Sequence, residues 1–339
     1  MAQTTPQQQA AIDALMQRYD GHVPGASLLV LKDGQPVVRQ AWGYADLQNE
    51  VRATPQTNYR LASVSKQFTA AAILLLAEDG KLSVDDPVRK WLPTLPPATD
   101  GIRIHHLLSH GSGLIDYEDV MDANQQSQLH DSDVLALLET QDKLYFPPGS
   151  DYRYSNSAYC LLALIVAEAS GQSFPAFVKA RIFDKLGMDN SVVHVDGEDS
   201  VADRAYGNSE IDGQWQRTDQ SPTSATLGDG GVYSSIDDLA KWDAALYDER
   251  LLKAASLQAA FSPQTKTPEP DVPFYGYGWR INGNALWHSG ETIGGRNVIL
   301  RYPKEHLTIV ILSNRNDPEP YQTALQIAAL FRERGGKTE

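Results

Sequence analysis

The segment Ser63-Val-Ser-Lys-Gln-Phe-Thr-Ala-Ala-Ala-Ile-Leu-Leu-Leu-Ala-Glu78 is predicted to form one long apolar helix. Asp79-Gly80 follows it, and a glycine just after the last turn is a common helix end. The segment begins with an SxxK pattern, Ser63 and Lys66. Because residues three apart share a helix face, the lysine amine can reach the serine hydroxyl. The segment therefore predicts a helix that carries a serine and a lysine together at its N-terminus.

The SxxK pattern by itself is weak evidence for catalysis. A neutral lysine can accept the proton of a neighbouring serine, and a helix N-terminus favours developing negative charge. However, about one such pattern arises by chance in a chain with this content of serine and lysine. A helix-capping serine followed by a surface lysine explains the same residues, so further motifs have to decide.

Strand patterns occur at both ends of the chain, and helical patterns dominate the middle. Residues 26–32 and 36–42 flank Asp33-Gly34, a strong hairpin signal because both turn positions favour positive φ. Since an isolated hairpin is only marginally stable, we expect the two ends to pair in one sheet. The later strand patterns are 277–281, 285–288, 298–302 and 307–313; the helical ones are 6–20, 63–78, 85–91, 103–109, 131–140, 156–170, 174–186, 236–247, 251–260 and 320–334.

These elements predict an α/β (α+β) fold, in which an antiparallel sheet built from both termini is flanked by helices and interrupted by a mostly helical domain. We place the sheet domain at residues 1–60 and 230–339, and the helical domain at residues 61–229. A cleft between two such domains is a common place for an active site.

A second motif is Tyr154-Ser-Asn156, which opens the predicted helix 156–170. A tyrosine close to a lysine ammonium ionises more readily and can shuttle a proton. The asparagine can hold a substrate amide or carbonyl. Tyr206-Gly-Asn208 is a competing copy, but it lies in a polar stretch without an apolar helix after it. We therefore prefer Tyr154, for which a packed turn tyrosine is the alternative.

A third motif is His288-Ser-Gly290, which ends a predicted strand and precedes Glu291. A strand edge offers unpaired backbone N–H groups, and an oxyanion hole requires such groups. Gly290 would allow close approach of a substrate. An ordinary strand-end turn is the alternative reading.

In this order, SxxK, YxN and [HK]-[ST]-G resemble the motifs of the serine β-lactamase and penicillin-binding protein superfamily. Surrounding segments resemble its class C β-lactamase-like branch, which includes D-Ala-D-Ala peptidases, D-aminopeptidases and esterases. The resemblance runs from about residue 20 to residue 315 and implies a β-lactamase/transpeptidase-like fold. The segments that carry it are 107–114, 148–156, 185–188, 230–239 and 275–279.

The resemblance implies a role for each motif residue. Ser63 would be the acylated nucleophile, and Lys66 and Tyr154 would share the proton transfers. His288 would take the catalytic place that lysine often holds in the third motif. The backbone N–H groups of Ser63 and Glu291 would form the oxyanion hole.

The substrate would meet a second group of residues. Asn156 would contact its acyl side, Ser289 and Gly290 would line the third motif, and Tyr117 would line the cleft. Arg296 follows two glycines, so it could bind an anionic group of the substrate or lie on the strand surface, and these two readings stay open. The resemblance implies no metal and no other cofactor.

Two departures from many β-lactamases bear on the substrate. A neutral imidazole at position 288 would hold a penicillin carboxylate less well than a permanent cation. We also find no class A type Glu-x-x-x-Asn loop that would activate a deacylating water. Both features favour an esterase or a D-stereospecific peptidase over an efficient β-lactamase.

Composition limits the remaining classes. The net charge of −14 argues against nucleic acid as a partner. The longest apolar run, residues 70–77, is too short for an integral membrane segment. One cysteine, Cys160, rules out an internal disulfide, and the pair His106 and His110 has no obvious third metal ligand.

The sequence therefore predicts a serine hydrolase that acts through an acyl-enzyme on an ester, an amide or a peptide. The alternative is a penicillin-binding or sensor-type protein that is acylated without efficient turnover. The polar start after Met1 favours a periplasmic or secreted protein whose signal peptide has been removed, with the cytoplasm as the alternative. The sequence does not determine the oligomeric state.

Overall fold

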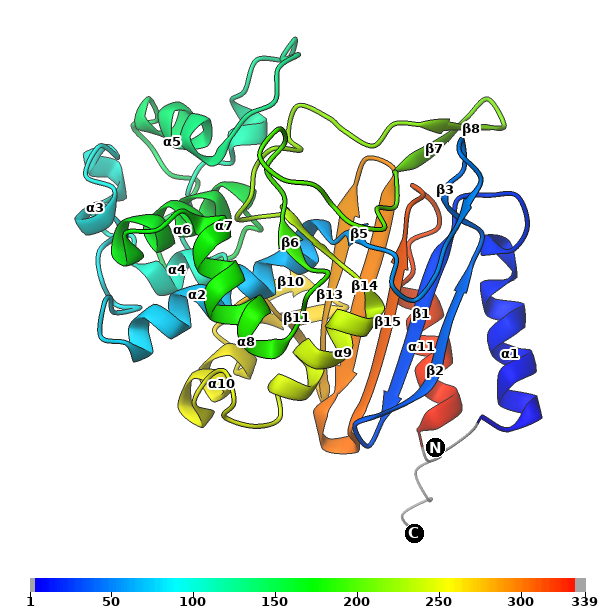
Figure 1. Cartoon of the computed structure of the whole chain (residues 1–339). Coiled ribbons are helices and arrows are strands. Elements are labelled where there is room, and N and C mark those ends of the chain that lie inside the picture. The colour runs from blue at the N-terminus through cyan, green and yellow to red at the C-terminus, as the bar shows by residue number, and fades with distance from the viewer. Residues whose placement is uncertain (1–3, 333–339) are drawn as a thin grey trace.

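The structure, a computed structural model, describes residues 4–332 and is built on one eight-stranded antiparallel sheet (Figure 1). The strands are β1 (Ala26–Lys32), β2 (Gln35–Trp42), β10 (Thr265–Glu269), β11 (Val272–Tyr275), β12 (Arg280–Asn282), β13 (Ala285–Thr292), β14 (Gly295–Tyr302) and β15 (Leu307–Ser313). Their order in the sheet is β10-β11-β12-β13-β14-β15-β1-β2.

The N-terminal hairpin completes the C-terminal half of this sheet. β1 pairs with β15 along its whole length, from Ala26 opposite Ser313 to Lys32 opposite Leu307. The predicted sheet from both chain ends is therefore confirmed. Every residue of β1 except Lys32 is buried, because helices cover both faces of the sheet.

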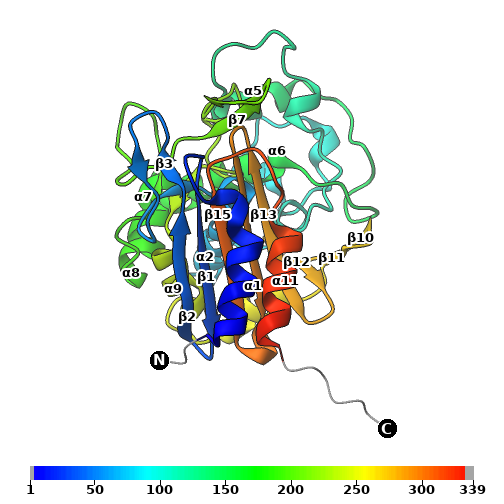
Figure 2. The same cartoon turned by 90° about the vertical axis from the view of Figure 1, so that its right-hand side faces the viewer.

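Two terminal helices, α1 (Pro6–Met16) and α11 (Tyr321–Phe331), cover the outer face of the sheet (Figure 2). Ile12 and Ile327 belong to one apolar cluster with the outward side chains of the central strands. Trp287 of β13 stacks on Tyr321 with ring centroids 3.7 Å apart. Burial of these side chains holds the two chain ends on one layer.

The inner face is covered by α9 (Ile236–Ala245), and α2 (Lys66–Glu78) belongs to the same apolar cluster, with α6 (Asn156–Ser170) packed against α2. Every residue of α2 from Lys66 to Leu76 is buried. A buried ion pair joins the layers, since Arg301 Nε of β14 donates to Asp243 Oδ1 of α9 at 2.6 Å. The active-site motifs thus lie between the sheet and its inner helical layer.

The other elements complete the helical part and three small sheets. The helices are α3 (Val88–Trp91), α4 (Ile104–Leu108), α5 (Asp131–Glu139), α7 (Phe174–Val178), α8 (Asp184–Leu186) and α10 (Ala254–Phe261). Short helical turns are η1 (Gln17–Tyr19), η2 (Ala62–Ser65), η3 (Pro97–Thr99), η4 (Tyr117–Asp119), η5 (Lys179–Phe183) and η6 (Pro303–Glu305). Two of the small sheets are hairpins, which pair β3 (Tyr44–Asp46) with β4 (Val51–Arg52) and β7 (Asn208–Ile211) with β8 (Gln214–Arg217). In the third, the central strand β9 (Val232–Ser234) pairs with both β5 (Tyr59–Arg60) and β6 (Val192–Val193).

Three expectations about the elements need correction or stay open. Ser63 lies in the 3₁₀ turn η2 rather than in the α-helix, which begins only at Lys66. The strands β10, β11, β7 and β8 were not expected, because their runs contain proline, charged or amide residues that have low strand propensity. Residues 333 and 334 of the expected closing helix, and residues 1–3 of the polar start, lie outside the described residues.

The boundaries of the two expected domains, at residues 60–61 and 229–230, stay a prediction.

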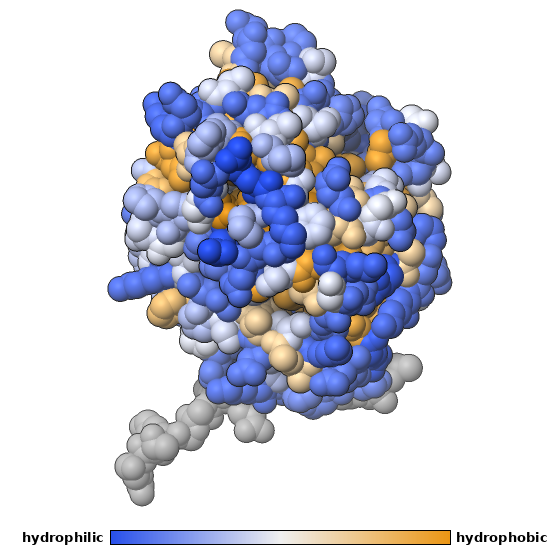
Figure 3. All heavy atoms as spheres, turned by 90° about the vertical axis from the view of Figure 1, so that its left-hand side faces the viewer, coloured by the Kyte–Doolittle hydropathy of each residue, from blue (hydrophilic) through white to orange (hydrophobic). Residues whose placement is uncertain are grey.

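No single helix within residues 4–332 has both the length and the hydrophobicity to cross a membrane. The segments 156–170 and 174–186 meet those criteria only jointly, across a 75° bend. Hydrophilic residues occupy most of the helical side of the molecule (Figure 3).

Candidate active site

Ser63 is presented by a tight turn whose backbone is held from two sides. Ala62, directly before it, has a left-handed backbone with φ of +49°, which is uncommon for a residue with a side chain. On the sheet side, a Cβ on Gly290 would lie 2.0 Å from the carbonyl oxygen of Leu61. The glycine of the third motif therefore lets β13 pack against the serine turn. Its expected role in admitting substrate is corrected, because the backbone of Leu61 fills that space.

Lys66 is fully buried and has three oxygen atoms around its amine. Its Nζ lies 3.0 Å from Ser63 Oγ, 2.8 Å from Asn156 Oδ1 and 3.0 Å from the carbonyl oxygen of Asp229. In the 3₁₀ turn, residues i and i+3 eclipse, which brings the serine and lysine side chains together. The SxxK pair and the asparagine of the YxN motif therefore meet around one amine.

Tyr154 lies beside this amine but does not hydrogen-bond to it. Lys66 Nζ is 4.8 Å from the centroid of the tyrosine ring. The Tyr154 hydroxyl is buried and has no hydrogen-bond partner among the described residues. Ser155 caps α6 by accepting the N–H of Ala158, which fixes the backbone just after the tyrosine.

His288 lies behind the cleft, in β13, with no exposed surface. Its Nδ1 is 2.6 Å from the carbonyl oxygen of Ser289 and therefore donates, which leaves Nε2 to accept from the Tyr275 hydroxyl at 2.9 Å. Burial lowers the pKa of His288 well below its ordinary value, and the charges of Arg280 and Lys66 act in the same direction. The structure thus places His288 as a neutral residue next to the site, not on the cleft surface.

His110 supports the YxN segment from the opposite side. It is fully buried, and its Nδ1 accepts the backbone N–H of Ser155 at 3.1 Å. Its ring lies 4.3 Å from the ring of Tyr154. His106 Nδ1 likewise accepts a backbone N–H, from Arg103. Because Nδ1 is the acceptor in both histidines, the proton of each neutral ring lies on Nε2, so neither ring has a free lone pair for a shared metal.

A cleft of about 390 Å³ opens over the serine. Its helical wall includes Tyr117, Glu118, Tyr154, Asn156 and Asp229, and its sheet wall includes Arg280, Ser289, Glu291, Thr292 and Ile293. Of the expected motif residues, Ser63, Tyr154, Asn156 and Ser289 line this cleft. Lys66 contacts Ser63 but is not part of the lining, and neither are His288 and Gly290. A larger hollow of about 690 Å³ near His105 and His106 holds none of the motif residues.

Tyr117 and Arg296, two of the residues expected to meet the substrate, are held in place by their surroundings. The Tyr117 side chain reaches the cleft but is almost wholly enclosed, and burial raises the pKa of its hydroxyl. The Arg296 guanidinium is 2.7 Å from Glu291 Oε1 and also donates to two backbone carbonyls, so that it lies outside the cleft lining. Glu291 itself lines the cleft, as its expected oxyanion-hole role requires.

Sequence reasoning missed four charged residues of the cleft, Arg60, Glu118, Asp229 and Arg280. Glu118 accepts from Asn156 Nδ2 at 2.8 Å, and Arg280 Nη1 donates to Ser289 Oγ at 3.1 Å. Each of these bonds ends on a motif residue, so a search for charges near the motifs in space would have found them. In sequence, only the position of Glu118 next to Tyr117 gave a signal.

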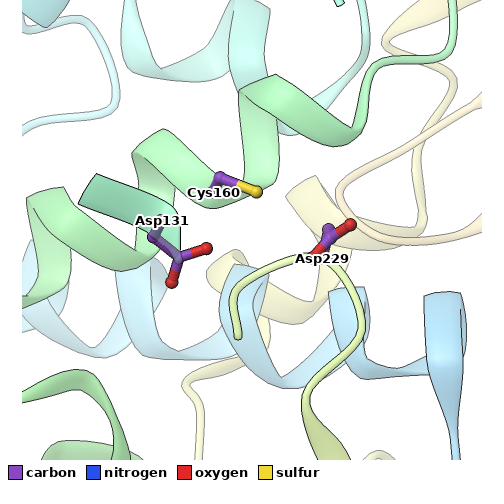
Figure 4. A group of neighbouring side chains, drawn as sticks. All are labelled: Asp131, Cys160 and Asp229. Carbon is purple, nitrogen blue, oxygen red and sulfur yellow. The ribbon is translucent and has the colours of Figure 1, made fainter. Parts of the chain in front are cut away.

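A buried cluster of Asp131, Cys160 and Asp229 lies behind the helical wall, with one ligand atom from each within 4.8 Å of the others (Figure 4). Asp131 accepts the backbone N–H of Leu227 at 3.1 Å. Burial raises the pKa of Asp131 to about 7, and burial also raises the pKa of Cys160 well above its ordinary value. A protonated thiol is a poor metal ligand, so we assign the cluster to anchoring residues 227–229 beside Lys66.

Comparison with known proteins agrees with this geometry. A sequence model of the family described as Beta-lactamase matches residues 9–332. The chain is also 32% identical over 327 residues to Penicillin-binding protein 4* of Bacillus subtilis (strain 168), covering 91% of this chain and 72% of that protein. The chain belongs to the beta-lactamase family.

Other members of the beta-lactamase family extend the comparison. The chain is 28% identical to a D-aminopeptidase of Gluconobacter oxydans (strain 621H), covering 95% of this chain and 61% of that protein. The octameric penicillin-binding protein homologue from Pyrococcus abyssi superposes with a TM-score of 0.83 at 27% identity, over 96% of this chain and 76% of that one. Family membership and the predicted β-lactamase/transpeptidase-like fold are thereby confirmed.

Proposed function

We propose that this protein is a serine hydrolase of the beta-lactamase family that cleaves an ester or amide bond through an acyl-enzyme on Ser63. The observation that carries the proposal is the position of Lys66 Nζ, 3.0 Å from Ser63 Oγ in a substrate-sized cleft. This distance lies within hydrogen-bond reach, as a nucleophile and its base require.

The surroundings of Lys66 suit a base. A neutral amine has two N–H donors and one lone pair. Its donors would go to Asn156 Oδ1 and the Asp229 carbonyl, and the lone pair would face Ser63 Oγ. When Ser63 Oγ bonds to the substrate carbonyl carbon, its proton passes to the amine. The resulting ammonium has an acceptor for every N–H once Ser63 is acylated.

Tyr154 then completes the proton path. Its hydroxyl has no partner among residues 4–332, so it is available to a substrate group in the cleft. It would pass a proton to the leaving oxygen or nitrogen when the tetrahedral intermediate collapses. The backbone N–H groups of Ser63 and Glu291 would hold the carbonyl oxygen during both steps. Water would then release the acyl group from Ser63.

His288 has an indirect part in this proposal. As a buried, neutral acceptor for Tyr275, it would position the sheet wall rather than transfer protons. Because a neutral, buried His288 offers no positive charge to a penicillin carboxylate, an esterase or peptidase remains preferred over an efficient β-lactamase. The D-aminopeptidase among the relatives supports a substrate of the amide class.

A second candidate is a protein that binds penicillin without efficient turnover. The observation in its favour is that two of the similar proteins, Penicillin-binding protein 4* and the Pyrococcus abyssi homologue, are named for penicillin binding. The cleft would then be acylated once and remain blocked.

One experiment separates these candidates. Wild-type protein and Ser63→Ala are each mixed with a penicillin and, separately, with a short activated ester, and intact mass and product are followed. We expect ester turnover by the wild type alone. A lasting penicillin adduct without ester turnover would favour the second candidate, and equal ester turnover by Ser63→Ala would refute the assignment of Ser63.

The cellular location and the partner belong to the same proposal. We place the protein outside the cytoplasm, acting on a small ester, amide or peptide rather than on nucleic acid. Names of relatives that refer to penicillin binding support an extracytoplasmic site, since penicillin targets act in that compartment. Fractionation of the source cells, followed by N-terminal sequencing of the mature chain, tests it.

A further inference from the structure

A second cavity, of about 190 Å³, lies behind the wall of the active-site cleft, and we call it the rear cavity. Among residues 4–332, Arg60 alone lines both the cleft and the rear cavity. The segment 223–231 contributes to both in turn: Thr223, Asp229 and Gly230 line the cleft, and Ser224, Ala225, Leu227 and Gly231 line the rear cavity. This segment and Arg60 therefore form the partition between the two spaces.

Arg60 is the cation of the rear cavity that lacks a carboxylate partner. Arg204, the other arginine of the lining, pairs with Asp219 at 2.6 Å, and His194 bonds to Asp199. Within residues 4–332, the Arg60 guanidinium bonds to backbone carbonyls only. The remaining titratable residues of the lining are exposed to solvent, which screens any charge they carry: His130 and Asp196.

The Arg60 guanidinium has more N–H groups than acceptors. Its Nη2 donates to the carbonyl oxygen of Ser224 at 2.9 Å, and its Nε donates to that of Gly230 at 3.4 Å, near the limit of a hydrogen bond. Its Nη1 is buried and has no hydrogen-bond partner among the described residues, although a guanidinium carries five N–H donors. The Nε of Arg204 lacks a partner in this part of the chain too. A carboxylate would supply the paired acceptor oxygens that suit an arginine fork.

Apolar side chains form another part of the lining. The buried Tyr233 of β9 borders the cavity together with Val195, Ala225 and Leu227. Small-molecule sites combine apolar walls of this kind with a few placed polar groups. The rear cavity has about half the volume of the cleft, so it suits a ligand smaller than the drug-sized molecules that occupy about 300–1,000 Å³.

We propose that the rear cavity is a second binding site, which takes a small carboxylate with an apolar body and thereby slows the acylation of Ser63. The carboxylate would bind Arg60, and the apolar body would pack against Tyr233, Ala225 and Leu227. The binding site stands independently of the proposed function, whereas its effect on acylation rests on that function.

The partition connects this site to the catalytic amine. Arg60 holds the segment 223–231 through the carbonyl groups of Ser224 and Gly230. The carbonyl of Asp229, directly before Gly230, accepts from Lys66 Nζ at 3.0 Å. A bound carboxylate would compete for Arg60 with the Gly230 carbonyl, because that bond is the longer of the two. The resulting shift of the segment would move one of the three acceptors of Lys66 and lower the rate of acylation.

The test uses benzoate as the probe, with benzamide as its uncharged counterpart. Binding is measured by calorimetric titration, and acylation by an activated ester is followed by rapid mixing with and without each probe. We expect benzoate to bind at least about 10-fold more tightly than benzamide, the ratio that one charge-assisted hydrogen bond accounts for. Saturating benzoate should lower the limiting rate of acylation by about 5-fold or more, the lower end of the usual coupling between two sites. The ester concentration for half the limiting rate should stay nearly the same.

Two variants place the probe in the rear cavity. Ala225→Leu narrows the cavity at a residue that does not line the cleft and keeps every charge, and Arg60→Gln removes the guanidinium. Each should weaken benzoate binding by about 10-fold or more and bring the ratio of acylation rates with and without benzoate close to one. Because this ratio is formed within each variant, a change in its basal rate does not obscure the result.

Arg250→Gln is the matched control, because Arg250 is exposed, is paired with Asp248 and lines neither space. It should leave both the affinity for benzoate and the ratio of acylation rates as in the wild type.

The outcomes separate the rear site from the proposed function. If benzoate only raises the ester concentration for half the limiting rate, and binds Ala225→Leu as it binds the wild type, it binds in the cleft and the rear site is refuted. If benzamide binds as tightly as benzoate, the assignment of a carboxylate to Arg60 is wrong. If benzoate binds through Arg60 but leaves the acylation rate unchanged, the connection through the partition is refuted. If the ester does not acylate Ser63 while benzoate binding still depends on Arg60 and Ala225, the rear site stands and the proposed function fails.

Discussion

Lys66 and His288 are both completely buried beside one cleft, yet their surroundings prepare them for different tasks. Lys66 has three oxygen atoms within 3.0 Å of its amine. His288 has one tyrosine hydroxyl, the carbonyl of its own strand and the guanidinium of Arg280 nearby. The amine is placed for proton exchange with the serine hydroxyl, whereas burial and the neighbouring guanidinium keep the imidazole neutral. Burial alone therefore does not identify a catalytic base, and the partner atoms do.

The largest effect should come from removing the amine. We expect Lys66→Met to lower the rate of acylation by at least about 10³-fold, since it deletes the base next to the nucleophile. Because Lys66 is buried, the change should also cost roughly 1–3 kcal/mol for each carbonyl acceptor left unpaired. Rapid-mixing kinetics with the activated ester and urea unfolding measure the two effects.

The exposed residue Lys81, in the turn after α2, provides the control for this variant. Lys81→Met should leave the rate of acylation as in the wild type. It should change the free energy of unfolding by no more than about 0.5 kcal/mol. Retention of acylation in a folded Lys66→Met would show that the amine is not the base.

The two tyrosines of the site sharpen the comparison. The Tyr154 hydroxyl has no hydrogen-bond partner within residues 4–332, so Tyr154→Phe should leave the free energy of unfolding within about 0.5 kcal/mol of the wild type and lower kcat by about 10²- to 10⁴-fold. Tyr275 donates to His288, so Tyr275→Phe should cost about 1–3 kcal/mol of stability and little activity. Thermal unfolding and kcat for both variants check this crossed pattern, and a reversed pattern would assign the proton transfer to Tyr275.

A smaller effect concerns the carboxyl that anchors residues 227–229. Burial raises the pKa of Asp131 to about 7 in the folded protein, against 3.8 for an ordinary aspartate. Below about pH 4, the Asp131 carboxyl carries a proton in both the folded and the unfolded state. As pH rises from about 4 to 7, the unfolded chain loses this proton while the folded protein keeps it, so the free energy of unfolding falls. Relative to Asp131→Asn, wild-type stability should fall by roughly 1.4 kcal/mol per pH unit in this window. Urea unfolding of both proteins at several pH values measures the difference in slope, and parallel slopes would contradict the raised pKa.

The smallest effect should come from Cys160. Burial raises the pKa of its thiol, so the folded protein should not react with a thiol reagent at pH 8 and the urea-unfolded protein should react fully. Cys160→Ser should leave acylation within about 3-fold of the wild type, because the thiol lies behind the wall and not in the cleft lining. Rapid labelling of the folded protein would show that the wall opens.

Much of the fold was readable because its signals are local. Asp33-Gly34 marked the β1–β2 hairpin, and the predicted helix at residues 156–170 coincides with α6. The β7–β8 hairpin is not predicted, although Asp212-Gly213 repeats the turn signal, because its strands carry glutamine and charged residues with low strand propensity. Backbone hydrogen bonds between Asn208 and the segment of Asn314 and Asn316 attach it to the rest of the fold.

For the site, the sequence by itself determined the three motifs and hence Ser63, Lys66, Tyr154 and Asn156. Turn chemistry and helix spacing act within a few residues, so these signals survive without a structure. Only the tertiary structure decided that His288 turns away from the cleft and that Glu118 and Arg280 charge its two walls. Those outcomes depend on which side of a strand or turn meets a segment far away in the chain, and burial and hydrogen-bond satisfaction fix that choice only when the layers pack.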